Sequence, residues 1–241
     1  MPHKLEILYE DNHLLIVNKR AGLLVQGDKT GDKPLVESCK GYLKKKYQKP
    51  GDVFLGVVHR LDRPVSGVVV FARTSKALER MNKLFHDKKV EKVYWAAVKN
   101  MPKAEEGHLT HWLMKDAKTN KTKAYNRQGK NALKSSLSYR MLGKLSSHFL
   151  LEVNPETGRS HQIRVQLAAM GCPIRGDLKY GYEKANEDGN INLHALMLNF
   201  EHPVKKAPLS IFAPLPEDQF WNHFSSLLDM KRKTIAANQP N

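Results

Sequence analysis

The residues best suited to chemistry lie at positions 59–67, which read His-Arg-Leu-Asp-Arg-Pro-Val-Ser-Gly. This segment places one carboxylate, Asp62, between the guanidinium groups of Arg60 and Arg63. A single carboxylate in a fixed loop can act as a base or a nucleophile, or stabilise a nearby positive charge. The same residues would also form an ordinary charged turn with a structural Asp–Arg pair. The segment alone therefore leaves a catalytic and a structural interpretation open.

Two short apolar runs, at 53–58 and 68–71, flank this segment and are rich in β-branched residues. Both runs are predicted to be buried strands. A loop between two core strands is held at both ends, so its side chains can be directed to one place. Within the loop, Pro64 fixes one backbone angle, and Gly67 permits a turn that other residues disfavour.

A second candidate for chemistry is Tyr94, in the sequence Lys-Val-Tyr-Trp-Ala at positions 92–96. The alternation over 90–98 predicts a strand with Tyr94 on one face and Val93 and Trp95 on the other. A tyrosine on a strand most often packs in a core or at an interface, so its position alone does not assign a function.

A third polar motif, Gly-Arg-Ser-His-Gln-Ile-Arg, occupies positions 158–164. A helix is predicted from 157–158 to residue 170, with Gly171 as its terminator. Ile163 would face the core on this helix. Arg164 follows one position later, about 100° around the helix axis, so it need not share the buried stripe.

In this order, the three motifs resemble the signature of the RluA-type pseudouridine synthases. The loop matches the family's His-Arg-Leu-Asp followed by Ser-Gly, with Val65 where the family often has Thr. Positions 92–96 match its Lys-x-Tyr-x-Ala string, and 158–164 are close to its Gly-Arg-Thr-His-Gln-Ile-Arg string. The resemblance covers most of the chain, because it continues through 173–177, 179–181, 193–195 and 200–203.

The resemblance implies that Asp62 is the catalytic residue, that Tyr94 is the active-site tyrosine and that Arg164 pairs with Asp62. Forming pseudouridine breaks the N1–C1′ bond of uridine and rejoins the base through C5. No atoms are gained or lost, so no cofactor and no metal is expected. Asp62 could stabilise positive charge on the sugar, attack C1′ or remove a proton from C2′, and the sequence leaves these three roles open. Tyr94 offers a ring to stack on uracil and a phenol to move the C5 proton.

The target base must leave the RNA stack before it can react. The resemblance implies that the planar guanidinium of Arg60 fills the vacated place, while His59 is expected to brace the loop rather than to catalyse. Further RNA contacts are predicted at His59, Arg63, Lys92, Arg159, His161, Gln162, Lys118, Lys121 and Lys123.

The charge balance supports a nucleic-acid partner. The chain has 40 Lys and Arg against 24 Asp and Glu, a formal net charge of +16, and such an excess favours a polyanion. A membrane surface is the competing polyanion, but no apolar run approaches the ~20 residues of a spanning helix, so RNA is preferred. The most polar stretch, 115–134, is predicted to be a mobile basic loop or ribbon that either grips RNA phosphates or is a solvated insertion.

Two other classes of protein compete with this interpretation. A non-catalytic RNA-binding protein or RNA chaperone would explain the charge but not the three motif matches. A nuclease would need clustered acids for a metal, or paired histidines, and neither is visible. The preferred function is an RNA pseudouridine synthase, an isomerase that acts on specific uridines of structured RNA, tRNA or rRNA or both.

The fold implied by the resemblance is α+β: a mixed, largely antiparallel sheet with flanking helices around a central catalytic cleft. One catalytic domain is predicted over 1–230, in the compact form without a separate small RNA-binding domain before it, and a flexible tail over 231–241. Cys39 and Cys172 have no CxxC spacing and are expected to be buried, reduced thiols of a cytoplasmic protein that acts as a monomer. Further strands are predicted at 5–9, 14–17, 107–114, 136–142, 148–153 and 209–213, and helices at 35–47, after Ser75 or Thr74, and from Pro216.

Overall fold

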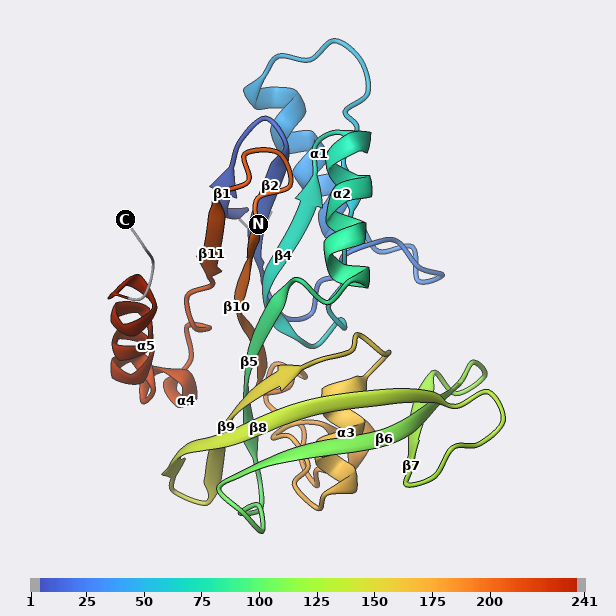
Figure 1. Ribbon diagram of the computed structural model, residues 1–241, viewed down its shortest axis with the longest axis vertical. Coiled ribbons are helices and arrows are strands. Elements are labelled where there is room, and N and C mark those ends of the chain that lie inside the picture. The colour runs from blue at the N-terminus through green and yellow to red at the C-terminus, as the bar shows by residue number, and fades with distance from the viewer. Residues whose placement is uncertain (1–4, 238–241) are drawn as a thin grey trace.

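The strands of residues 5–237, the part of the chain that this computed structural model describes, form one mixed sheet (Figure 1). Its strand order is β1-β2-β4-β10-β5-β9-β8-β6-β7, with β11 paired to β10 and β3 to β4. The β4–β10 pairing is parallel, and every other pairing between these strands is antiparallel. The strands are β1 (Glu6–Glu10), β2 (Leu14–Lys19), β3 (Gly56–Val57), β4 (Ser66–Ala72), β5 (Glu91–Val98), β6 (Glu106–Asp116), β7 (Lys121–Tyr125), β8 (Leu133–Leu145), β9 (His148–Pro155), β10 (Leu193–Glu201) and β11 (Pro208–Phe212).

Helices cover both faces of this sheet, which confirms the predicted α+β class. They are α1 (Leu35–Lys46), α2 (Ser75–His86), α3 (Gln162–Ala169), α4 (Gln219–Asn222) and α5 (Ser225–Ala237), together with the 3-10 helix η1 (Leu178–Tyr180). Side chains alternate along a strand, so neighbouring residues of β2 pack against different helices. Val17 packs in one cluster with Cys39 of α1, whereas Ile16 packs with Met81 of α2 on the opposite face. Helix α3 shares the face of α1, and α4 and α5 cover the other face.

The parallel contact between β4 and β10 depends on Gly67. Its φ is +118°, and a Cβ atom built there would lie 2.2 Å from the carbonyl oxygen of Ala195. Only glycine fits this close approach, since any side chain would push β10 away from the start of β4. Gly67 therefore sets where the segment that follows Asp62 joins the sheet.

The strand predicted at 53–58 is wrong in length, because β3 has only two residues, Gly56–Val57. β10 already occupies the edge of β4 at Ser66–Gly67, and β3 pairs only at Phe71–Ala72. Phe54, predicted to be buried, is 50% exposed. The predicted start of the third helix is also wrong: α3 begins at Gln162, since the preceding residue, His161, has a left-handed φ of 55° that no helix interior accepts.

The structure decides one prediction for a charged segment and corrects another. Of the loop and the ribbon predicted for residues 115–134, the structure has the ribbon: β7 pairs with β6 over 112–116, and residues 126–132 connect β7 to β8. The flexible tail predicted at 231–241 is wrong as far as Ala237, which is the last residue of α5. Positions 238–241 lie outside the described residues. The predicted buried free thiols, Cys39 and Cys172, are confirmed.

Candidate active site

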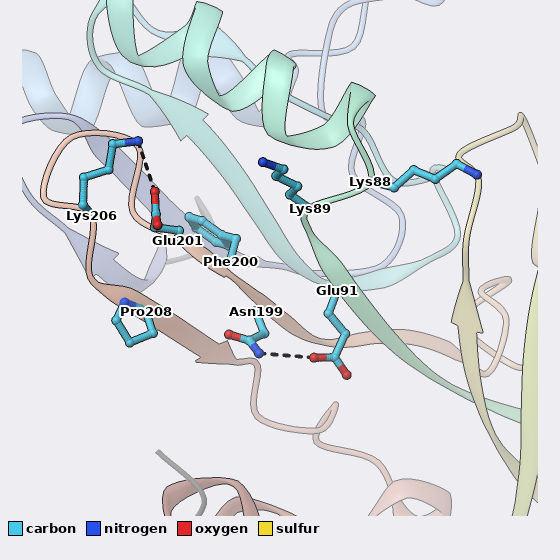
Figure 2. A pocket seen from close by; sticks show the side chains of 8 residues that line it. All are labelled: Lys88, Lys89, Glu91, Asn199, Phe200, Glu201, Lys206 and Pro208. Atoms are coloured by element: carbon cyan, nitrogen blue, oxygen red, sulfur yellow. Dashed lines mark hydrogen bonds and ion pairs between the residues drawn. The ribbon is translucent and has the colours of Figure 1, made fainter. Parts of the chain in front are cut away.

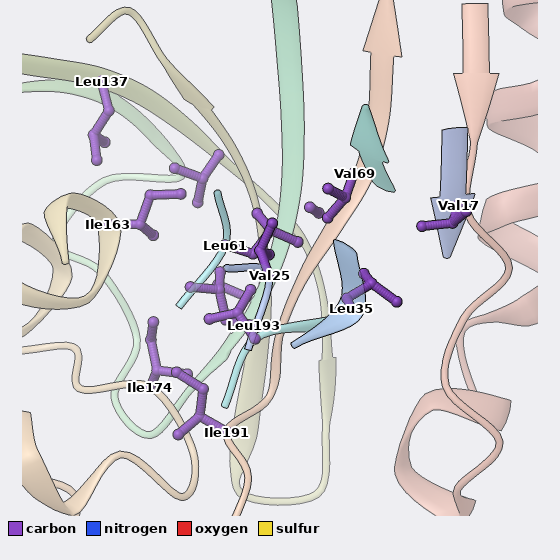
Figure 3. Close-up of a cluster of buried hydrophobic side chains, with 14 of the residues drawn as sticks. Val17, Val25, Leu35, Leu61, Val69, Leu137, Ile163, Ile174, Ile191 and Leu193 are labelled. Carbon is purple, nitrogen blue, oxygen red and sulfur yellow. The ribbon is translucent and has the colours of Figure 1, made fainter. Parts of the chain in front are cut away.

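The loop that carries Asp62 is anchored on both sides of that residue. Leu61 is 8% exposed and lies in the main hydrophobic cluster, beside Val25 and Leu193 (Figure 3). On the other side of Asp62, the carbonyl oxygen of Arg63 accepts hydrogen bonds from Gly22 N at 2.8 Å and from Lys19 Nζ at 3.1 Å. Asp62 therefore lies between the buried side chain of Leu61 and the fixed backbone of Arg63.

His59 holds the beginning of this loop against the sheet. Its Nε2 accepts a hydrogen bond from Val70 N at 3.1 Å, in the gap along β4 between the pairings with β10 and β3. The imidazole ring stacks on Phe85 of α2, with 5.0 Å between centroids. Burial lowers the pKa of His59 to about 4, with a further contribution from Lys92. A neutral imidazole that already contacts Val70 and Phe85 agrees with the expected bracing role of His59. It leaves His59 poorly placed to bind RNA.

Arg164 lies between two carboxylates. Its Nε and Nη2 donate to Asp177 at 2.7 and 2.9 Å, and its Nη1 donates to Asp62 Oδ2 at 3.0 Å. The side chains of Arg164 and Asp177 are 7% and 1% exposed, and that of Asp62 is 27% exposed. Burial lowers the pKa of Arg164, but its bonds with Asp177 and the charge of Asp62 outweigh burial and raise it overall. The guanidinium is a fixed positive charge that orients Asp62.

Tyr180 connects this pair to the ribbon. Its hydroxyl accepts a hydrogen bond from Thr122 N at 2.9 Å and lies 2.7 Å from Nδ1 of His161. Because the hydroxyl proton remains free to go to Nδ1, His161 can carry its own proton on Nε2, which lies 3.9 Å from Asp62 Oδ2. The guanidinium of Arg164 lies 5.1 Å from the Tyr180 ring centroid.

Tyr94 packs against the main hydrophobic cluster, which also contains Leu61, the neighbour of Asp62. It pairs with Ala195 of β10 and Val153 of β9, so its backbone is at the centre of the sheet. Burial raises the pKa of the Tyr94 phenol, and the nearby negative charge of Asp62 raises it further. Tyr94 therefore keeps its proton at neutral pH and brings a flat, uncharged ring close to Asp62.

Lys19 is fully buried behind the loop. Besides Arg63 O, its Nζ donates to the carbonyl oxygens of Leu23 at 2.8 Å and Arg20 at 3.1 Å. Burial lowers the pKa of Lys19 to about 7, while Asp62 acts to raise it. With three carbonyl partners, the amino group of Lys19 fixes the backbone on which Asp62 sits.

The residues predicted to contact RNA fall into two groups. Arg60 and Arg159 are exposed, and no hydrogen bond or ion pair engages the Arg60 side chain within residues 5–237. Gln162 is 4% exposed, and its amide is occupied by Ser136 O at 2.9 Å and Arg159 N at 3.0 Å. The prediction for Gln162 is therefore corrected to a structural role.

Arg63 and Lys92 are also engaged within the protein. The Arg63 guanidinium pairs with Asp32 and donates to Gly22 O at 3.1 Å, so it ties the loop to residues 22–32. Lys92 is partly buried with its Nζ 3.4 Å from Thr157 O, and burial lowers its pKa. Because both side chains are engaged within the protein, they are less available to contact RNA than the sequence predicts.

The ribbon lysines are exposed. Along β7, Lys121 and Lys123 alternate with Thr122, which is 3% exposed, so the two lysines share the outer face. Lys121 Nζ lies 5.9 Å from the ring centroid of Tyr180, and Lys118 is in the turn that joins β6 to β7. The predicted phosphate-binding lysines therefore begin beside the Asp62 centre and extend away from it.

A hollow of about 450 Å³ lies elsewhere, between the end of α2 and the β10–β11 connection (Figure 2). Glu91 and Asn199 line it and are hydrogen-bonded to each other at 3.2 Å, and Lys206 pairs with Glu201. Glu91 is an odd number of residues from Tyr94 along β5, so the two side chains point to opposite faces. This hollow is therefore not part of the Asp62 centre.

Three residues of the centre were missed from the sequence: Lys19, Asp177 and Tyr180. Asp177 and Tyr180 fall within the flanks that carry the family resemblance, so those flanks were an available signal. Lys19 comes two residues after the apolar run 14–17, so its closeness to a predicted strand was the available signal. In the described part of the chain, no three His, Cys, Asp or Glu residues are grouped as a metal site, and no helix is long and apolar enough to span a bilayer.

Comparisons with known sequences agree with this arrangement. A family model described as RNA pseudouridylate synthase matches residues 13–169. The "Uncharacterized RNA pseudouridine synthase YlyB" of Bacillus subtilis is 34% identical over 220 residues, 90% of this chain and 71% of that protein. The "Ribosomal large subunit pseudouridine synthase C" of Vibrio cholerae is 34% identical over 215 residues, 87% of this chain and 65% of that protein.

Two solved human structures share the fold. RNA Pseudouridylate Synthase Domain Containing 4 matches with a TM-score of 0.74 and 25% identity over 93% of both chains. RNA Pseudouridylate Synthase Domain Containing 1 matches with a TM-score of 0.71 over 99% of this chain and 97% of its own, at 22% identity. The second likeness concerns the fold alone.

Proposed function

Because the chain belongs to the RNA pseudouridylate synthase family, a family of RNA-modifying isomerases, we propose that Asp62, Tyr94 and Arg164 convert uridine in structured RNA to pseudouridine. The observation that carries this assignment is the 3.0 Å hydrogen bond from Arg164 Nη1 to Asp62 Oδ2, held from behind by Asp177. It supplies one oriented and accessible carboxylate, which is the group that the reaction requires.

Asp62 acts at the sugar. As the N1–C1′ bond of uridine breaks, positive charge develops at C1′, and a carboxylate stabilises that charge best when it is preorganised. Stabilisation, attack at C1′ and proton removal from C2′ are all open to the Asp62 carboxylate. The bond that forms joins C1′ to C5, the proton on C5 is lost, and N1 becomes protonated, so the atoms balance.

Tyr94 acts at the base. Its raised pKa keeps the phenol neutral, so the ring can stack on uracil without adding a second negative charge beside Asp62. The phenol oxygen also offers a route for the C5 proton, either directly or through one water molecule. His161, with its pKa lowered mainly by burial, is a further neutral hydrogen-bonding group 3.9 Å from Asp62.

The substrate is RNA, and we propose tRNA or rRNA, or both, because the target base must be flipped out of a folded RNA. The formal charge of +16 and the exposed ribbon lysines support phosphate binding. The exposed, unengaged guanidinium of Arg60, two residues before Asp62, supports its role in filling the space of the flipped base. One chain supplies Asp62, Tyr94 and Arg164, which supports action as a monomer, and two free thiols support a reducing, cytoplasmic setting.

The test compares the purified protein with its Asp62→Asn variant on RNA from cells that lack the gene. The wild type should form pseudouridine at defined uridines, measured as tritium release from C5-labelled uracil. Asp62→Asn should bind the same RNA with similar affinity and release no tritium, since the amide carries no charge. Turnover by the variant would remove Asp62 from the mechanism, and RNA binding without turnover by the wild type would favour an RNA chaperone.

A further inference from the structure

The ribbon carries a pocket that the Asp62 centre does not use. The pocket has a volume of about 550 Å³ and is formed by Met114, Tyr125 and the connection that follows β7, including Arg127, Gln128 and Lys130. Pockets of 300–1,000 Å³ are typical of small-molecule sites, so this one is large enough for a nucleobase. The pocket lies at the end of β7, a strand with two exposed lysines.

The pocket lies on the same face of the ribbon as the phosphate-binding lysines. Tyr125 is two residues from Lys123 and four from Lys121, so all three side chains point to one side of β7. The other side is covered by α3, through a cluster that contains Ala124 and Val165. β7 is the last strand in the sheet order, and Figure 1 shows it at the free end of the ribbon.

Tyr125 presents its ring to solvent with an exposed fraction of 39%. Trp112 stands opposite it in the β6–β7 register, so a second aromatic side chain lies on the same face. Within residues 5–237, the side chains of Arg127, Gln128 and Lys130 make no hydrogen bond or ion pair. An exposed ring surrounded by free cations and a free amide matches the requirements of a nucleotide: stacking for the base and charge for the phosphate.

We propose that this pocket binds an unpaired base of the RNA substrate, stacked on Tyr125. Gln128 is placed to hydrogen-bond an edge of the base, and Arg127 and Lys130 to neutralise the neighbouring phosphates. This inference rests on the proposed function, and it adds a second point of attachment besides the flipped uridine. The pocket selects for the presence of an unstacked base rather than for its sequence, because every base has a π-face.

The two points of attachment are connected through β7. Thr122 N is hydrogen-bonded to Tyr180, which contacts both His161 and Arg164 of the Asp62 centre. Tyr125 lies three residues farther along the strand, a distance of ~10 Å. A stacked RNA strand spans this distance in roughly three nucleotides, at ~3.4 Å each. A loop or bulge of the same RNA can therefore occupy both places.

The test measures binding of two fluorescent probes by anisotropy: a ten-nucleotide oligoadenylate and a ten-residue abasic backbone with the same phosphates. Oligoadenylate contains no uridine, so it cannot be a substrate. The wild type should bind oligoadenylate roughly 5- to 150-fold more tightly than the abasic probe. Tyr125→Ala and Tyr125→Leu should lose most of this preference, whereas Tyr125→Trp should keep it. Phe54→Ala, a control at an exposed aromatic residue between α1 and β3, should behave as the wild type.

Each other outcome overturns the proposal. Unchanged preference in both Tyr125→Ala and Tyr125→Leu would mean that the pocket binds no base and is left for a protein partner. An equal loss for both probes would make the pocket a phosphate site only. Tyr125→Leu keeps the apolar bulk, and circular dichroism of each variant excludes unfolding. Tritium release by the wild type is measured in parallel, so failure of the proposed function is recognised separately from failure of the pocket.

Discussion

Asp177 binds Arg164 through two parallel hydrogen bonds, of 2.7 Å to Nε and 2.9 Å to Nη2, and leaves only Nη1 of the guanidinium to reach Asp62. A planar guanidinium held at two nitrogens cannot rotate. Its third nitrogen is therefore a donor with a fixed direction. The position of the Asp62 carboxylate therefore depends on Asp177, which lies 13 positions beyond Arg164. Asp177 is buried and has no access to substrate.

Replacing this support should reduce turnover without reducing RNA affinity. Asp177→Asn keeps the size of the side chain but can accept only one of the two hydrogen bonds, so Arg164 becomes free to move. A displacement of about 1 Å at a reacting group costs on the order of 10²-fold in rate. Single-turnover rates at saturating RNA should fall by about that factor, with the dissociation constant unchanged. Asp177→Glu should restore part of the rate, and a normal rate in Asp177→Asn would contradict the orienting role.

Removing the cation itself should affect both stability and rate. Arg164→Met leaves the buried carboxylate of Asp177 without a partner, which destabilises a protein by ~3–5 kcal/mol. Adding Asp177→Asn to Arg164→Met removes that buried charge, so the double variant should unfold at a higher denaturant concentration than Arg164→Met alone. Both should turn over RNA far more slowly than the wild type while binding it. If affinity falls and the saturated rate is preserved, Arg164 is a phosphate ligand and not a partner of Asp62.

The ribbon lysines should set the salt dependence of RNA binding. Combining Lys118→Ala, Lys121→Ala and Lys123→Ala should flatten the slope of log affinity against log salt by ~0.7–0.9 for each phosphate that the variant no longer neutralises. The matched control removes three exposed lysines after or within α1, through Lys44→Ala, Lys45→Ala and Lys49→Ala. An equal effect of both triple variants would show that only net charge matters and that the ribbon makes no specific contact.

Acid should loosen the catalytic loop through His59. Its pKa is about 4 in the folded protein and about 6.5 when exposed. The unfolded chain therefore takes up the proton first, and this contribution to stability is present above pH 6.5 and is lost as pH falls towards 4. His59→Gln keeps an acceptor for Val70 N and cannot titrate.

The free energy of unfolding, measured by urea from pH 7 to pH 4, should thus fall less in His59→Gln than in the wild type. The difference should be on the order of 1 kcal/mol, since partial exposure of the ring screens the effect. His86→Gln, at a histidine with a side chain 88% exposed, is the control and should follow the wild-type curve. Parallel curves for all three proteins would contradict the bracing role of His59.

The pairing of Asp62 with Arg164 could be predicted from the sequence only through the family resemblance. Helical periodicity places Arg164 outside the buried stripe, yet its side chain is buried, because Asp177 supplies the compensating charge from the residue before η1. Helical periodicity reports which residues make apolar contacts. It does not predict an ion pair, such as Arg164–Asp177, between segments that come together only in the folded chain. Lys19 was missed for a similar reason, because Arg63 O, one of its three carbonyl acceptors, comes near it only in the folded chain.

The errors in element boundaries have local causes. The polar stretch at 157–161 is not helical as predicted, because Gln162 binds back to Ser136 and Arg159, and His161 takes a left-handed conformation. The ribbon lysines were predicted as a group, but their composition alone favours a loop. The β6–β7 register is supplied by apolar partners such as Leu113 and Ala124 across the strands, a weak signal among so many lysines.

The parallel contact between Ser66 and His194 also dictates when the enzyme can become active during its own synthesis. Asp62 leaves the ribosome first, and His194 of β10, the parallel partner of β4, follows 128 residues after Ser66. At ~5–20 residues per second, the nascent chain carries the Asp62 loop without β10 for roughly 6–25 seconds. An unfinished polypeptide therefore already exposes its basic segments to nearby RNA before it can isomerise a uridine.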